Sequence, residues 1–142
     1  MIDLASLDTK TPAEAGVVVQ LDNPFTGEPL TLDDGSPCTI TVLGQDSAKM
    51  RAYTRQVTDR NIERLRKGRD AMKSEAAEAD RIGGLATVTT AWNLFPLDGQ
   101  TLDCTERNAK KLYSDPRFPW IVEQLEKAVM DRARFFPRAS SN

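Results

Sequence analysis

The side chains that usually perform catalysis or bind metals are scarce in this 142-residue chain. It contains no histidine, which excludes a Ser-His-Asp triad, a Cys-His pair and a histidine-bearing zinc site. Two cysteines, Cys38 and Cys104, lie far apart without a partner motif. We expect them to be reduced thiols that are buried or half-buried.

The remaining candidates for chemistry have simpler structural explanations. Asp33-Asp34-Gly35 is typical of a turn in which aspartates cap their own backbone. Gly83-Gly84 lacks the flanking glycines of a dinucleotide-binding motif, and no Gly-Lys-Ser/Thr phosphate loop occurs. Carboxylate-only catalysis or an aspartate magnesium site stays formally open, but no acidic cluster has convincing spacing. We therefore predict no enzyme, no cofactor and no metal site.

Composition is typical of a soluble globular protein, with 39% apolar and 28% charged residues. The length fits one domain, or a small β unit fused to a helical part. No apolar run is long enough to span a membrane, and residues 1–8 lack the basic and apolar regions of a signal peptide. The cytoplasm is therefore the expected location.

Charge is distributed unevenly along the chain. Residues 1–46 hold one base against eight acids, a net charge of −7, whereas residues 47–69 hold eight bases against two acids, a net charge of +6. Clustered bases can bind nucleic acid phosphates. The whole chain has a net charge of −2 and no nucleic-acid motif, however. The pattern favours a solvated helix face, or one that pairs with the acidic part, and nucleic acid is not an expected partner.

The pattern predicts an α+β fold, with a small N-terminal antiparallel β unit followed by a mostly α-helical C-terminal part. Residues 1–14 are expected to form an arm. Residues 15–46 form the β unit, with strands at 16–21, 30–32 and 38–43 separated by turn-rich segments.

Residues 47–136 are the predicted helical part. Asp46 or Ser47 is suited to cap the first helix, whose apolar stripe has three- and four-residue spacing. A second helix is expected from about Asp70 to Trp92, and Gly83-Gly84 marks either a kink in it or a close helix contact. The stripe of the first helix is Met50, Tyr53, Val57, Asn61 and Leu65.

Two further helices are expected after a turn at Asp98-Gly99. Thr105 is a good N-cap for a helix to Tyr113, and Pro116 or Pro119 suits the first turn of the last helix. Residues 137–142 are expected to be a flexible tail. The apolar stripe of the last helix is Phe118, Ile121, Val122, Leu125, Ala128, Val129, Arg132 and Phe136.

The aromatic residues of the C-terminal part are candidates for a partner-binding surface, since aromatic side chains often anchor interfaces. The alternative is that they form the helical core, which we favour for Trp92 and Trp120. Adjacent Phe135 and Phe136 cannot both face one side of a helix, so one of them is a candidate exposed contact. The predicted partner-binding residues are Trp92, Phe95, Trp120, Ile121, Leu125, Phe135 and Phe136.

The order of features along the chain is more specific than any one of them. An acidic β part containing segments 23–30 and 40–47 precedes an Arg-rich helix, a helix ending at Trp92 and the Asp98-Gly99 turn. A C-terminal pattern then ends in segment 131–135. This pattern is Glu106, Asn108, Leu112, Tyr113, Pro116, Trp120, Ile121 and Gln124. In this order, the features resemble those of the tail assembly chaperones of long-tailed bacteriophages.

The resemblance implies a non-enzymatic chaperone in the host cytoplasm. It implies that the chain binds the tape measure protein, keeps it soluble and helps recruit the major tail tube protein. Our hypothesis is that residues 47–136 hold the client, while the β unit mediates self-association into a homo-oligomer or contacts tail subunits by edge pairing. Two alternatives stay open: a structural virion component such as a tail or head–tail adaptor, and a DNA-binding regulator built on the basic helix.

Overall fold

A three-stranded antiparallel sheet joins distant parts of the chain in the computed structural model, which describes residues 3–68 and 74–135. The central strand β2 (Thr39–Val42) pairs with β1 (Val17–Gln20) on one side and with β3 (Thr89–Asn93) on the other. β-branched side chains dominate β1 and β2, as suits half-buried strands. The predicted α+β class is confirmed.

The third strand comes from a part of the chain that was expected to be helical. The predicted strand at 30–32 is wrong, because this segment makes only an isolated bridge between Thr31 and Pro37. Pro29 and Pro37 have no N–H group to donate, which prevents a continuous ladder there. The helix predicted to reach Trp92 instead ends at Val88, and the chain continues directly into β3.

Capping explains where several helices begin. The Ser47 hydroxyl accepts a hydrogen bond from the Met50 N–H at 3.3 Å, and Thr105 accepts one from the Asn108 N–H at 3.0 Å. Pro119 occupies the first turn of the last α-helix, so these three start signals are confirmed. The helices are η1 (Leu4–Leu7), α1 (Lys10–Ala15), α2 (Ala48–Arg66), α3 (Ser74–Val88), α4 (Glu106–Ser114), α5 (Pro119–Val129) and η2 (Arg132–Arg134).

The last helix is shorter than predicted. α5 ends at Val129, and Asp131 adopts a non-helical backbone in which its carboxylate accepts from the Ala133 N–H at 3.1 Å. This contact starts the short helix η2, so the predicted stripe does not continue as one helix beyond Val129. Phe136 and the predicted tail 137–142 lie outside the described residues.

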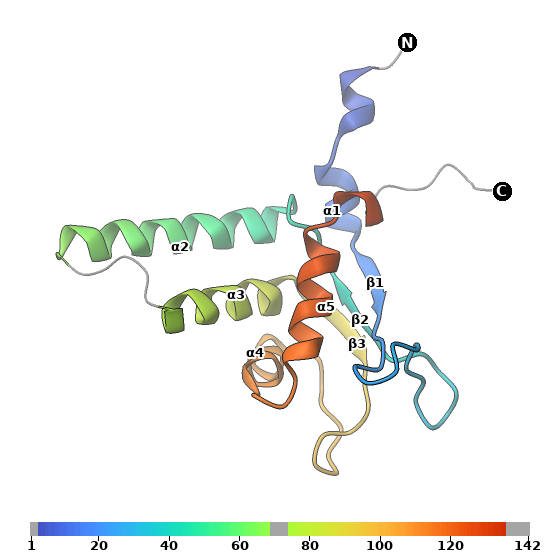
Figure 1. Cartoon of the computed structure of the whole chain (residues 1–142). Coiled ribbons are helices and arrows are strands. Elements are labelled where there is room, and N and C mark those ends of the chain that lie inside the picture. Colours follow the sequence, from blue (N-terminus) through green and yellow to red (C-terminus); the bar gives the residue numbers. More distant parts are fainter. Residues whose placement is uncertain (1–2, 69–73, 136–142) are drawn as a thin grey trace.

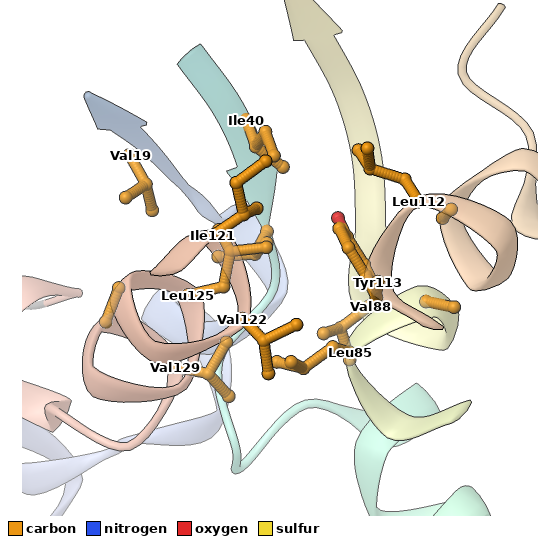
Figure 2. Close-up of a cluster of buried hydrophobic side chains, with 14 of the residues drawn as sticks. Val19, Ile40, Leu85, Val88, Leu112, Tyr113, Ile121, Val122, Leu125 and Val129 are labelled. Carbon is orange, nitrogen blue, oxygen red and sulfur yellow. The ribbon is translucent and has the colours of Figure 1, made fainter. Parts of the chain in front are cut away.

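A single hydrophobic core contains side chains from both the β unit and the helical part. Val19 and Ile40 of the sheet pack with α5, whose Leu125 lies among them (Figure 2). Leu85 of α3 and Leu112 of α4 complete the cluster on the side away from β1. The two parts predicted from the sequence are therefore joined by shared buried surface.

The basic helix α2 does not fold back onto the acidic β unit. It runs from Ser47 away from the sheet and lies along α3, so that much of its length projects from the body (Figure 1). Arg60 pairs with Asp80 of α3 at 3.4 Å. No side chain of α2 is fully buried. Its charge is therefore largely available to solvent.

Candidate functional site

An open groove of about 420 Å³ lies between α2, α3 and α5. α3 packs against both other helices and forms the floor of the groove, while α2 and α5 form its walls. Most of the lining side chains are apolar. The groove is lined by Met50, Tyr53, Thr54, Val57, Ala77, Asp80, Arg81, Gly84, Leu85, Glu126, Val129 and Met130.

The glycine pair of α3 sets the spacing between α2 and the floor. A Cβ atom built on Gly83 would lie 2.2 Å from the Tyr53 hydroxyl oxygen, so only glycine permits this approach. The Tyr53 hydroxyl donates to the backbone carbonyl of Asp80 at 2.9 Å. The alternative left open by the sequence is thus decided in favour of a close helix contact.

A charged pair bridges the opposite wall. Arg81 of α3 donates to both carboxylate oxygens of Glu126 on α5, from Nε at 2.8 Å and from Nη2. These hydrogen bonds raise the pKa of the Arg81 guanidinium. Because Arg81 and Glu126 neutralise each other at the edge of the groove, the groove itself offers chiefly apolar surface to a ligand.

Two methionines flank the groove and make its surface adaptable. Met50 lies on α2, and Met130, which follows α5, is 64% exposed. Unbranched thioether side chains rearrange readily around partners of different shape. This arrangement suits the binding of an apolar protein segment.

The structure does not gather the predicted partner-binding residues into one surface. Ile121, Leu125 and Phe135 are buried, and they cannot contact a partner unless packed elements separate. Trp92 and Trp120 are half-buried against the core. Phe95, in the loop after β3, is 39% exposed. Phe136 lies outside the residues that the structure describes.

Two polar side chains of this region, those of Trp92 and Gln124, have structural roles. The Trp92 indole N–H donates to the Leu102 carbonyl at 2.9 Å, which holds the loop that carries Phe95. The Gln124 side chain accepts from the Asp22 N–H at 2.9 Å and donates to the Asp22 carbonyl at 3.0 Å. α5 is thereby fastened to the loop that follows β1.

None of the residues that line the groove is among the predicted partner-binding residues, although the sequence contains part of the pattern that forms the groove. The spacing of Met50, Tyr53 and Val57 predicts the apolar side of a helix. The glycine pair indicates either a kink or a close helix contact. The sequence does not show that this stripe and the glycine pair lie beside α5, because that depends on packing between elements far apart in the chain.

The remaining candidates for chemistry are in structural settings. Cys38 is buried and Cys104 half-buried, both as free thiols, and burial raises the pKa of each. Asp34 accepts from the Ser36 N–H at 2.9 Å and from its hydroxyl, which lowers the pKa of Asp34. Within residues 3–68 and 74–135, no group of three or more His, Cys, Asp or Glu side chains could hold a metal ion.

Comparison of the chain with protein-family models, with curated proteins and with solved structures finds no match. Among the described helices, none combines the length and the hydropathy that crossing a membrane requires.

Proposed function

We propose that this chain is a non-enzymatic phage tail assembly chaperone of the host cytoplasm. It binds the tape measure protein, keeps it soluble and helps recruit the major tail tube protein. One observation supports the proposal most directly: the open apolar groove between α2, α3 and α5. A helical client needs such a surface, and it needs no catalytic group.

The chemistry of the groove fits the apolar side of an amphipathic helix. Such a helix would place side chains at three- and four-residue spacing into the groove. Met50 and Met130 would adapt to side chains of different size. Exposed apolar helices aggregate when they are unpaired, and covering their apolar side is what keeps them soluble.

Co-expression with the tape measure protein tests the proposal. We expect the client to become soluble and to co-purify with the wild-type chain. Met130→Glu, which places a charge in the groove, should reduce the recovered complex about tenfold or more, because the charge would have to be desolvated. Leu7→Glu is the matched control, since Leu7 is 58% exposed but lies in η1, remote from the groove. It should leave recovery unchanged.

If the wild-type chain neither dissolves nor captures the tape measure protein, the proposal is wrong. The rival function, a structural virion component, then becomes the one to test in purified particles. A tail or head–tail adaptor is retained in the particle, whereas a chaperone is lost during assembly.

A further inference from the structure

The charges inside the groove between α2, α3 and α5 are already paired. Arg81 is hydrogen-bonded to Glu126, and the Asp80 carboxylate lies 3.4 Å from the Arg60 guanidinium. The other side chains of the lining are uncharged. Any preference for the charge of a ligand must therefore come from exposed side chains along the edges of the groove.

The edge of the groove that α2 forms is basic. Thr54 lines the groove, and Arg51, three residues earlier, lies on the same side of the helix. Arg55 follows Arg51 by four residues, so the two side chains are one helical turn apart, about 6 Å along the axis. Both arginines are exposed. We call Arg51 and Arg55 the basic edge.

Acids near the basic edge do not neutralise it. Among residues 3–68 and 74–135, no carboxylate forms an ion pair with Arg51 or Arg55. Asp46 is attracted to Arg51, but its carboxylate is hydrogen-bonded by Arg132. Asp59 lines a separate pocket between α2, α3 and α4. The positive charge of the basic edge is therefore available to a ligand in the groove.

The opposite edge, which α5 forms, carries both signs of charge. Glu123 precedes the lining residue Glu126 by three residues, and Lys127 follows Glu123 by four, so the two lie near each other on this helix. Both are exposed. Because their charges offset each other, this edge favours neither an acid nor a base on a ligand. The groove is therefore asymmetric, and its charge preference comes from α2.

We propose that the groove selects an amphipathic helix whose apolar stripe is bordered by acidic residues. A helix in the groove lies nearly along α2, so two carboxylates four residues apart on it face Arg51 and Arg55. The apolar lining disfavours a nucleic acid as the ligand of these arginines, because a phosphate backbone offers no apolar side to cover it. This inference rests on the function proposed above and names the chemistry of the client segment.

Two synthetic helical peptides test the charge preference. They share one apolar stripe at three- and four-residue spacing and carry either Glu or Lys along both of its borders, so the direction in which a peptide lies does not matter. By fluorescence anisotropy at about 0.01 M salt, the full chain should bind the Glu peptide about tenfold more tightly than the Lys peptide. At about 1 M salt, where the Debye length is about 3 Å, the two affinities should converge. The net charge of −2 would by itself favour the Lys peptide.

A charge reversal locates the preference on the basic edge. Arg51→Glu/Arg55→Glu should make the chain bind the Lys peptide more tightly than the Glu peptide. Arg107→Glu/Lys111→Glu is the matched control, because it changes the charge equally, at the same four-residue spacing, on exposed positions of α4 that do not line the groove. It should keep the preference of the wild-type chain. All four side chains are exposed, so circular dichroism should report the same folded state for each variant.

The possible failures of the two proposals are distinguishable. Equal binding of both peptides in low salt, or a preference for the Glu peptide that persists in Arg51→Glu/Arg55→Glu, would overturn the charge selection alone. If neither peptide binds, the groove does not hold a helix, and the charge selection and the main support for the proposed function are both lost. Recovery of the tape measure protein with Met130→Glu probes the groove itself and does not depend on the basic edge.

Discussion

At the scale of single residues, Tyr53 packs closely against Gly83 in the helical part. The tyrosine ring covers the glycine pair, and its hydroxyl reaches the Asp80 carbonyl. A methyl group at Gly84 would meet ring carbons at 3.3 and 3.4 Å, whereas at Gly83 it would overlap the hydroxyl oxygen. The two neighbouring glycines are thus predicted to tolerate alanine very differently.

Gly83→Ala should lower the free energy of unfolding by about 1–3 kcal/mol, because Tyr53 must move and lose its hydrogen bond. The gain in helix propensity, about 1 kcal/mol, offsets only part of this loss. Urea denaturation of the purified variants measures the difference. Gly84→Ala is the control and should change stability by less than Gly83→Ala.

A second substitution tests the cause. Tyr53→Phe removes the hydroxyl oxygen that a methyl group at Gly83 would meet. The double variant Gly83→Ala/Tyr53→Phe should therefore lose less stability than the sum of the single variants. Strictly additive losses would show that the hydroxyl is not the group that collides.

Asp46 makes stability depend on pH. Arg132 donates to its carboxylate from Nε at 2.6 Å and from Nη2 at 3.0 Å, and these hydrogen bonds lower the pKa of Asp46 in the folded chain. A carboxylate with a depressed folded pKa stabilises the fold above its unfolded pKa of about 3.9, and this contribution is lost as pH falls through the folded value. The pair ties the start of α2 to η2.

Asp46→Asn should therefore be less stable than the wild-type chain near neutral pH, by up to about 1 kcal/mol because the pair is partly exposed. The difference should shrink as pH falls below about 4. Urea denaturation at a series of pH values measures it. In an Arg132→Gln background the substitution should have little effect, and a difference that persists unchanged in acid would contradict the assignment.

At the scale of elements, the junction between α3 and β3 is fastened to α4. The Thr89 hydroxyl donates to the Leu85 carbonyl at 2.7 Å and lies 2.7 Å from the Tyr113 hydroxyl. Tyr113 is buried, and burial raises the pKa of its phenol. The contact holds the end of a helix and the start of a strand at the position where β3 pairs with β2.

Thr89→Val and Tyr113→Phe should destabilise the chain unequally. Thr89→Val leaves the buried Tyr113 hydroxyl without a partner, at a cost of about 1–3 kcal/mol. Tyr113→Phe removes that hydroxyl while Thr89 keeps its bond to Leu85, at a cost of about 0.5–1.5 kcal/mol. Chemical denaturation gives both values. Equal losses, or a larger loss for Tyr113→Phe, would show that Tyr113 has another hydrogen-bond partner.

At the scale of the whole molecule, the N-terminal and C-terminal parts share one core. β2 is the central strand between β1 and β3, and Ile40 is fully buried beside α5 (Figure 2). Removing residues 1–46 therefore removes two of three strands and uncovers the apolar side of α5. The helical part has no alternative cover for this surface in the described fold.

A fragment of residues 47–142 should consequently lack cooperative thermal unfolding and dispersed NMR signals. Deletion of residues 1–7 is the control, because η1 has no buried residue, and it should leave both properties intact. A fragment 47–142 that melts cooperatively would show that the helices form an independent unit.

Local interactions are what the sequence by itself determined about this chain. The caps at Ser47 and Thr105, the helix start at Pro119 and the turn at Asp98-Gly99, where both residues have positive φ, depend on neighbours within a few residues. The apolar spacing of α5 likewise predicted its buried side. These signals were sufficient for the α+β class.

Tertiary structure decided what depends on partners far along the chain. The sequence pattern predicts a helix to Trp92, but residues 89–93 form a strand because they pair with the edge of β2 that β1 leaves open. The same long-range packing buries Ile121, Leu125 and Phe135, brings Tyr53 onto Gly83 and leaves Met130 beside an open groove. Backbone pairing and burial join residues that no local pattern relates, so the strand, the exposed side chains and the groove required the folded chain.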